Sequence, residues 1–379
     1  MAAKARCSQN DRLQVFKGTF IHSTDSFPLE ILDPSLLGVN EKGKIVFIEA
    51  AGKEEELSQT WHFKKENIRV LRPKEEFFIP GLIDTHIHAS QYPNMGSCLD
   101  LPLLQWLVKY TFPVEAKFKD LKFAEDTYTK VVYPLVKPIV TPRFVPSCSS
   151  ELLQQLGSFA NSNNLHIQSH ISESHAELDV VKEIFPKCKD YSDVYDKHGL
   201  LTDKTIMAHG VYLSDEELKL FHKKGAAISH CPNSNISLCS GLFDIRNALN
   251  HKVNVGLGTD VSGGYSPSVL NAVRAAMDVT KILSLKASDN ESLSYEEIFR
   301  VATLGGSQAL GLDKLTGNFE VGKDFDAVLV NTNVPNNPFE VFPNDTLQDI
   351  FQKFLFLGDD RNMVEVYVAG KQVIPFPKS

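Results

Sequence analysis

Apolar residues follow two different rhythms in this chain, one at its ends and one in its centre. Near both ends, short apolar runs alternate with turn residues, which is the pattern of β-strands. The runs that predict strands there are Gln14–Phe20, Gly43–Ile48, Ile68–Leu71, Asp326–Val330 and Val364–Val368. No helix of useful length is expected before Pro80. We expect both ends to pair into one small β domain that flanks a central unit.

In the centre, apolar strands are followed by helical patterns of about 10–15 residues, the βα rhythm of a parallel barrel or sheet. The six strands that this rhythm predicts are Gly81–His88, Val136–Arg143, Leu165–His170, Thr205–His209, Ala226–His230 and Val253–Asp260. The helical stretches that follow several of them are Glu151–Ser162, Glu173–Phe185, Asp215–Lys224 and Pro267–Leu283. The chain is therefore expected to be of the α/β class, with a central domain at 80–313 and a flanking domain made of 1–79 and 314–379.

Composition and charge are those of an ordinary globular protein. Of the 379 residues, 42% are hydrophobic and 23% are charged, and the net charge is −8, which argues against a nucleic-acid or anionic-membrane surface. No apolar run reaches the ~18 residues of a membrane helix, and Met1–Val15 lacks the apolar region of a signal peptide. The six cysteines lack Cys-x-x-Cys spacing, so we expect reduced thiols and a cytosolic protein.

The most informative polar positions are His86 and His88, at the end of the first central strand. Residues i and i+2 of a strand share one face, so both imidazoles are expected to point the same way. Two neutral imidazoles that converge from one strand end suit a zinc-type divalent ion. Taken alone, the two residues could equally be a pair of surface histidines.

Later central strands end in the same kind of side chain, namely His170, His209 and Asp260. A barrel of parallel strands places its active site at the carboxyl ends of those strands. Any one of these residues could be a hydrogen-bonded core residue. Five ligand-type side chains at four strand ends, however, favour a metal site.

Glu173 follows His170 by three residues and could reach the space beside an ion without binding it. Beside a metal, proton shuttling is the role that fits this carboxylate, whereas without one it would be a helix-start glutamate favoured by the helix dipole. His230 and Cys231 also end a strand and are expected to serve packing and support. Histidines in loops and on helical faces are expected at the surface: His22, His62, His175, His198, His222 and His251.

Several motifs resemble those of the amidohydrolase superfamily and, within it, the guanine deaminase family. The resembling runs are Pro80–His88, His88-Ala89-Ser90-Gln91-Tyr92, Thr141-Pro142-Arg143-Phe144, Gln168–Glu173, His230–Asn235 and Leu257–Asp260. The resemblance extends over most of the chain. It implies a (β/α)8 TIM-type barrel with a small β-sandwich domain formed by both chain ends.

The resemblance also implies a metal-dependent reaction of purine catabolism. One zinc ion per chain would be held by His86, His88, His170 and Asp260. Such an ion supplies hydroxide at neutral pH, which would attack C2 of guanine and yield xanthine and ammonia. By the same resemblance, the protein is expected to be a homodimer.

Further roles follow from the same resemblance. Glu173 would move protons, His209 would orient the hydroxide, and Asp260 would accept the proton of the hydroxide. The positions that match the family's substrate-binding residues are Gln91, Arg143, Phe144, His170, Glu173 and Asp260. A site that pairs buried polar groups with the polar edges of a substrate can reject analogues strongly.

The strand count departs from the family pattern, since six strands are predicted where a (β/α)8 barrel has eight. The gap is local, because a helix-like stretch leads through Tyr133-Pro134-Leu135 straight into the strand at Val136. The family has two further βα units there. We therefore expect a shortened barrel with open sheet edges, and a deaminase whose activity is lost or much reduced.

Two other functions remain open. A cyclic-amide hydrolase of the same superfamily would hold two metals bridged by a modified lysine at the end of the fourth strand. The corresponding strand here ends in Thr141–Phe144, and Lys137 lies near its start, which disfavours that function. A non-catalytic binding or scaffold protein that has kept a deaminase-like shell is the second possibility, and the missing strands are its main support.

Overall fold

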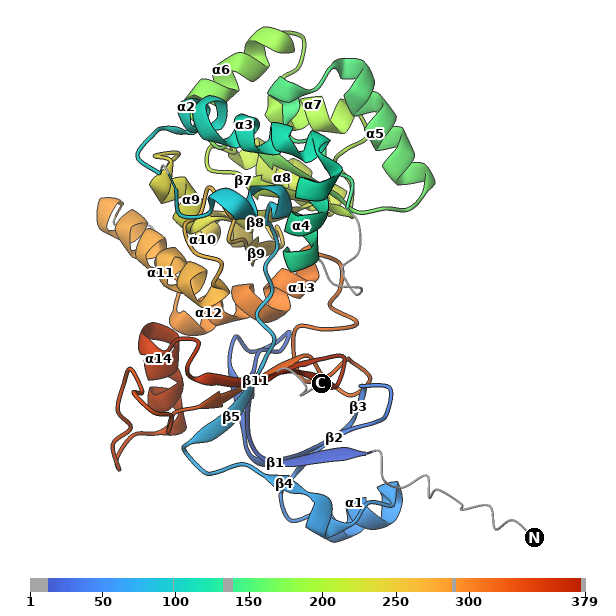
Figure 1. The fold of residues 1–379 in the computed structure, drawn as a ribbon, viewed down its shortest axis with the longest axis vertical. Coiled ribbons are helices and arrows are strands. Elements are labelled where there is room, and N and C mark those ends of the chain that lie inside the picture. Colours follow the sequence, from blue (N-terminus) through green and yellow to red (C-terminus); the bar gives the residue numbers. More distant parts are fainter. Residues whose placement is uncertain (1–12, 98, 132–138, 288–290, 376–379) are drawn as a thin grey trace, which may run out of the picture. The chain divides into compact units, whose positions relative to one another are not determined.

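The fold comes from a computed structural model that describes residues 13–97, 99–131, 139–287 and 291–375. The chain divides into two compact units (Figure 1). One unit is formed by Met1–Gly81 together with Asp313–Ser379, and the other by Leu82–Leu312. Each unit contains a β-sheet of its own.

In its described residues, the unit made from both chain ends has one eight-stranded sheet. Its strands, in hydrogen-bonded order, are β12 (Lys371–Ile374), β11 (Met363–Val368), β10 (Ala327–Asn331), β5 (Glu76–Pro80), β1 (Gln14–His22), β2 (Glu30–Val39) and β3 (Ile45–Ala50), and β4 (Arg69–Val70) pairs with β1. Because β10 pairs antiparallel with β5, strands from both ends of the chain lie in one sheet, as their apolar runs predicted.

Phenylalanine side chains dominate the core of this unit. Phe78 of β5 meets Phe16 of β1 edge to face at 5.1 Å between ring centroids and stacks on Phe20 at 5.9 Å. Leu37 of β2 and Tyr367 of β11 belong to the same cluster, so the sheet curls around one shared core. Among the described residues the strands form one continuous sheet, where the resemblance implied the two packed sheets of a sandwich.

The expectation that no helix of useful length precedes Pro80 is wrong, because α1 spans the eight residues Glu54–Trp61. Three glutamates stand in its first turn, where negative charge is favoured by the helix dipole. Only Leu57 is buried, so the helix has no apolar stripe that a periodicity search could detect. The other helical segments of this unit are η1 (Lys65–Asn67) and α14 (Leu347–Leu357).

Two histidines expected at the surface are buried. His22 ends β1, is 4% exposed, and its Nδ1 accepts a hydrogen bond from the backbone N–H of Phe319 at 3.2 Å. Burial lowers the pKa of His22 to about 4, so its imidazole is neutral at pH 7. His198 is 8% exposed, and its ring lies 2.7 Å from the carbonyl oxygen of Val194. In both rings Nδ1 pairs with a main-chain group, which leaves no sequence signal, and Nε2 of His198 also pairs with the hydroxyl of Ser150 at 2.8 Å.

The other unit contains a parallel sheet with the strand order β6 (Ile167–Ile171), β7 (Thr205–His209), β8 (Ala227–His230) and β9 (Val255–Leu257). All five residues of β7 are buried, as expected of a parallel strand covered on both faces. The helical segments before β6 are η2 (Ala89–Asn94), α2 (Leu103–Trp106), η3 (Leu107–Thr111), α3 (Phe112–Glu115), η4 (Ala116–Lys119), α4 (Leu121–Val131), η5 (Val145–Ser147) and α5 (Ser150–Ser162). Those after it are α6 (His175–Ile184), α7 (Tyr191–Lys197), α8 (Asp215–Lys224), α9 (Pro232–Ser237), α10 (Ile245–Asn250), α11 (Val269–Lys286), α12 (Tyr295–Arg300), η6 (Val301–Gly305) and α13 (Gly306–Ala309).

Two of the six predicted central strands do not form regular strands. The first, Gly81–His88, runs beside β9 and the residues that follow β9. The N–H of Thr85 donates to the carbonyl oxygen of Leu257, and the N–H of Asp260 donates to the carbonyl oxygen of His86. No strand among the described residues pairs with its other side, so no full ladder forms. The second, Val136–Arg143, is reduced to a parallel bridge between Val140 and Ile167, and its residues 136–138, Lys137 included, lie outside the described residues.

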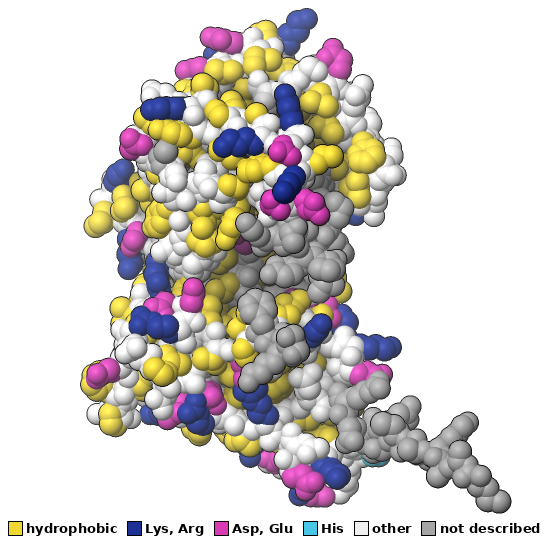
Figure 2. All heavy atoms as spheres, in the orientation of Figure 1, with side chains coloured by type: hydrophobic (Ala, Val, Ile, Leu, Met, Phe, Trp, Pro, Cys, Tyr) yellow, Lys and Arg dark blue, Asp and Glu magenta, His cyan; other side chains and the backbone are white. Residues whose placement is uncertain are grey.

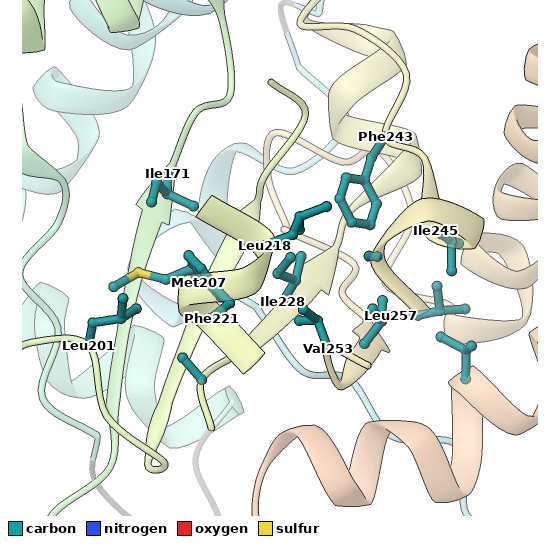
Figure 3. Close-up of a cluster of buried hydrophobic side chains, with 14 of the residues drawn as sticks. Ile171, Leu201, Met207, Leu218, Phe221, Ile228, Phe243, Ile245, Val253 and Leu257 are labelled. Atoms are coloured by element: carbon teal, nitrogen blue, oxygen red, sulfur yellow. The ribbon is translucent and has the colours of Figure 1, made fainter. Parts of the chain in front are cut away.

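Figure 3 shows how the parallel sheet is packed. Leu218 and Phe221 of α8 lie in one buried cluster with Met207 of β7 and Ile228 of β8. The helix is well bounded, because Ser214 and Glu217 form a capping box at its start. This packing holds the carboxyl ends of the strands in register.

On the face drawn in Figure 2, basic and acidic side chains are interspersed. Within the described residues, no helix combines the length and apolar character that crossing a membrane requires. The cysteines described, Cys148, Cys188, Cys231 and Cys239, are all free thiols, as their spacing predicted.

Candidate active site

Three histidine rings converge at the carboxyl ends of the parallel strands. Nε2 of His88 lies 3.1 Å from Nε2 of His86 and 3.1 Å from Nε2 of His170. Oδ1 of Asp260 lies 3.2 Å from Nε2 of His88 and 3.3 Å from Nε2 of His86. Nε2 of His209 lies 3.9 Å from Oδ2 of Asp260. The structure thus brings together the five ligand-type residues found at the predicted strand ends.

Backbone geometry fixes the loops that carry these side chains. The carboxylate of Asp84 accepts hydrogen bonds from the N–H of His86 at 3.2 Å and from that of Thr259 at 3.0 Å, which ties the two loops together. His209 and Asp260 adopt φ values of 75° and 46°. Left-handed backbone at residues other than glycine costs of order 1–3 kcal/mol and is typical of functional sites.

The second ring nitrogen of three of the histidines has an oxygen partner. The Nδ1 pairs are His86 with Oε1 of Gln168 at 3.2 Å, His170 with the carbonyl oxygen of Arg143 at 2.6 Å, and His209 with Oδ1 of Asn235 at 2.8 Å. An oxygen acceptor assigns the proton to Nδ1, so Nε2 keeps its lone pair. Nε2 of His209 is buried and has no hydrogen-bond partner among the described residues. Imidazole nitrogens of this kind beside a carboxylate fit a zinc-type ion.

Electrostatics support the same protonation states. Burial lowers the pKa of His88 to about 4 and that of His170 well below its ordinary value, and the neighbouring His86 lowers both further. Burial alone would raise the pKa of Asp260, but hydrogen bonds with His86 and His88 keep it well below its usual range. At neutral pH, His88 and His170 are therefore neutral imidazoles beside the ionised carboxylate of Asp260.

Glu173 lies beside this cluster, between β6 and α6, and is 4% exposed. Its Oε1 accepts a hydrogen bond from the hydroxyl of Ser240 at 2.9 Å, and its Oε2 lies 3.3 Å from Nε2 of His209. Burial, and then the charge of Asp260, raise the pKa of Glu173 to about 8. The carboxyl group is therefore suited to hold a proton near neutral pH.

A second buried carboxylate supports the main chain of Glu173. Oε2 of Glu177 accepts a hydrogen bond from the backbone N–H of Glu173 at 2.8 Å, and Oε1 accepts one from the hydroxyl of Tyr191 at 2.8 Å. Burial, and then the charge of Glu173, raise the pKa of Glu177 to about 7. Glu177 thus fixes the backbone position of Glu173.

A pocket opens beside the cluster, and residues of the cluster form part of its lining. Gln91, Arg143 and Phe144 line it, as expected from the resemblance. The amide of Gln91 is already engaged at both ends: Nε2 donates to Oε1 of Glu115 at 3.0 Å, and Oε1 accepts from the N–H of Ser262 at 3.2 Å. These two bonds orient the amide and leave its second N–H available to a substrate.

Several residues of the site were not predicted from the sequence. Asn235 and Gln168 stand in motifs that the resemblance quoted, so their support of His209 and His86 had a sequence signal. Ser240 follows α9 in a turn, and Trp106 ends the apolar helix α2. Their positions in the site depend on tertiary packing, which no local pattern encodes.

Comparison with known proteins gives consistent results. A profile of the amidohydrolase family matches residues 128–373. The chain is 47% identical to the guanine deaminase of Homo sapiens over 443 positions, which span 96% of this chain and 97% of that protein. The solved structure of guanine deaminase from C. acetobutylicum, with guanine bound in its active site, matches with a TM-score of 0.85 and 32% identity, and the match covers 95% of this chain and 99% of that one.

The alignment with the human relative has more positions than the number of residues of this chain that it includes. It has 443 positions, whereas 96% of 379 residues is about 364, so roughly 80 residues of the relative face gaps in this chain. The relative from Escherichia coli, 29% identical over 439 positions and 95% of this chain (about 360 residues), gives nearly the same difference. Despite these gaps, the similarity extends from end to end of both proteins, and the chain belongs to the guanine deaminase family of the amidohydrolases.

Proposed function

We propose that this chain is a hydrolase that converts guanine and water to xanthine and ammonia. The observation that carries the proposal is Glu173, a buried carboxyl group that lines the same pocket as His88, His170, His209 and Asp260. The names of the human and mouse relatives, at 47% and 46% identity, support guanine as the substrate.

One zinc-type ion is the cofactor that the donor set fits, and we propose His86, His88, His170 and Asp260 as its ligands. When bound, such an ion lowers the pKa of a water molecule to about 7 and so supplies hydroxide at neutral pH. Nε2 of His209, buried and without a hydrogen-bond partner among the described residues, can orient the attacking water. Asp260, kept ionised by its histidine neighbours, can accept the proton of that water.

Glu173 moves the protons of the reaction. Ser240 holds Oε1, which leaves Oε2 to exchange protons with the water and the purine. The water oxygen is added at C2, a ring nitrogen takes up a proton, and the C2–N bond breaks as the amino group leaves as ammonia. Arg143 offers donors to the polar edge of the base, and the ring of Phe144 packs against its face.

The test is a reaction with defined metal content. Purified chain loaded with zinc is expected to release xanthine and ammonia from guanine in a one-to-one ratio and to hold one zinc per chain. Dihydrouracil serves as the control substrate, because a cyclic-amide hydrolase would open its ring. Two metals per chain with ring opening would replace the deaminase proposal with that alternative.

We further propose that the barrel is shortened by about two βα units and that its activity is reduced. The roughly 80 residues of the human relative without a counterpart support this, as do the six strand positions among the described residues, where a closed barrel has eight. Open strand edges loosen a site whose ligands must hold their geometry to within about 0.5 Å.

Restoring the unmatched segment is expected to raise activity. A chimera that carries the human relative's unmatched residues at Tyr133–Val136, where the sequence analysis places the gap, should turn over guanine at least about tenfold faster, because a misplacement of about 1 Å can cost about a hundredfold in rate. A control chimera with a flexible linker of equal length should bring no gain. Equal rates for the original chain and the chimera would contradict the proposed impairment.

The same gap favours a second candidate function, a non-catalytic binding protein with a deaminase-like site. This candidate predicts that guanine and zinc bind while no ammonia is released. For either function we propose a cytosolic homodimer, supported by the resemblance and by the free cysteines of the described residues.

A further inference from the structure

We propose that Trp106 binds the purine through its indole N–H and contributes to the selection of guanine, an inference that rests on the proposed function. Trp106 is the last residue of α2 and is 2% exposed. Its side chain lines the same pocket as Arg143, Phe144 and Glu173. It therefore borders the space where the base would lie.

The indole N–H of Trp106 is a donor with no acceptor in the described part of the chain. Its Nε1 is buried and has no hydrogen-bond partner among the residues that the structure describes. An indole nitrogen can only donate, and a buried donor without an acceptor costs free energy. A ligand that brings an acceptor into the pocket removes this cost, so binding favours such a ligand.

Other donors of the pocket are partly engaged. Gln91 donates one of its two amide N–H groups to Glu115, and its amide oxygen accepts from Ser262. Nε of Arg143 is the other buried donor of the pocket without a partner among the described residues. Guanine carries acceptors at O6, N7 and N3, so two of them can be matched by Trp106 and Arg143.

The surroundings hold the indole ring in one orientation. Trp106 packs in an apolar cluster with Leu103, Leu107, Phe144 and Leu238. Directly after Trp106 the helix widens into the π-helical turn η3, a feature that recurs at functional sites. Because the ring is fixed, its N–H discriminates between an acceptor and a C–H group at the same position of a ligand.

The chain provides a matched control, because the other of its two tryptophans, Trp61, lies in α1, outside the pocket, and is 39% exposed. Trp106→Phe and Trp61→Phe are thus the same chemical change inside and outside the pocket. Protein labelled with 15N-tryptophan gives two indole N–H signals, which the two variants assign. The ligands are guanine, the product xanthine, and the analogues 7-deazaguanine and 3-deazaguanine, in which a C–H group replaces an acceptor.

With the zinc-loaded chain, guanine or xanthine is expected to move the Trp106 proton signal downfield and to leave the Trp61 signal in place. Trp106→Phe should weaken guanine binding roughly tenfold, the effect of one lost hydrogen bond, whereas Trp61→Phe should leave it unchanged. If N7 or N3 is the acceptor, the corresponding deaza analogue should bind wild type and Trp106→Phe equally; if O6 is the acceptor, both analogues should lose affinity in Trp106→Phe.

Two results would overturn the inference: a Trp106 signal that does not respond to ligand, or guanine binding that is equally strong in Trp106→Phe and wild type. If Trp106→Phe does not fold, the test uses the Trp61→Phe variant, in which the Trp106 signal either moves when ligand is added, as the inference requires, or stays in place, which overturns it. Failure of the proposed function is visible separately, because a chain that binds guanine through Trp106 but releases no ammonia refutes deamination alone. A wild-type chain that binds neither guanine nor xanthine refutes both.

Discussion

Glu173→Gln is expected to lower kcat for guanine by about 10²–10⁴-fold, the usual contribution of a general acid–base group, while zinc content stays at the wild-type value. The amide keeps the size of the side chain and can still accept from Ser240 at Oε1. It cannot take up and return a proton. Ammonia release under saturating guanine, measured together with the metal content of the same sample, checks the prediction.

Two variants serve as controls for Glu173→Gln. Glu216→Gln makes the same change on an exposed side chain of α8 and should leave kcat unchanged. Glu173→Asp keeps the acid but shortens its reach and should recover part of the lost rate. A Glu173→Gln enzyme with kcat close to wild type would show that another group moves the protons.

Substitution of His88 and of His209 is expected to separate metal binding from catalysis. His88→Ala should weaken zinc binding, because Nε2 of His88 lies within 3.2 Å of atoms on three other proposed ligands. The expected loss is more than about 100-fold, since losing only a hydrogen bond that supports a ligand already costs up to about 100-fold. His209→Ala should keep its zinc but lose about 10²–10³-fold in kcat, as for other groups that stabilise a transition state. Zinc titration and ammonia release measure the two effects.

The alternative ligand set has its own signature. His86, His170, His209 and Asp260 each offer one ligand atom, and these atoms lie within 4.8 Å of one another. If this set binds the ion, His209→Ala loses zinc and His88→Ala keeps it, the reverse of our expectation. His175→Ala is the control for both variants, because His175 packs on Tyr212, with 3.9 Å between ring centroids, and is not one of the proposed ligands.

The parts of the site that sequence can predict are those that depend on strand order. Parallel strands end at one edge of a sheet, so His170, His209 and Asp260 were expected to lie close together, and the structure places them there. Both chain ends show strand periodicity and pair through β5 and β10. In each case the inference needs only the side-chain period and the direction of the chain.

The features that sequence could not predict depend on contacts between distant residues. Gln91 matches a base-binding position, but its amide is engaged by Glu115 and Ser262, which lie 24 and 171 residues away in sequence. The buried ring of His22 accepts at Nδ1 from a main-chain N–H 297 residues away in sequence. Such partners follow from the packing of the whole chain and not from any local pattern.

The hydrogen bonds that fix the histidine rings differ in how freely evolution can change them. His170 is oriented by the carbonyl oxygen of Arg143, which every amino acid possesses, whereas His209 is oriented by the side chain of Asn235. Position 143 can therefore exchange its side chain, which we propose contacts the substrate, while the proton on His170 stays on the same nitrogen. Position 235 has no such freedom. New substrate preferences in this lineage are thus expected to arise through position 143 rather than through position 235.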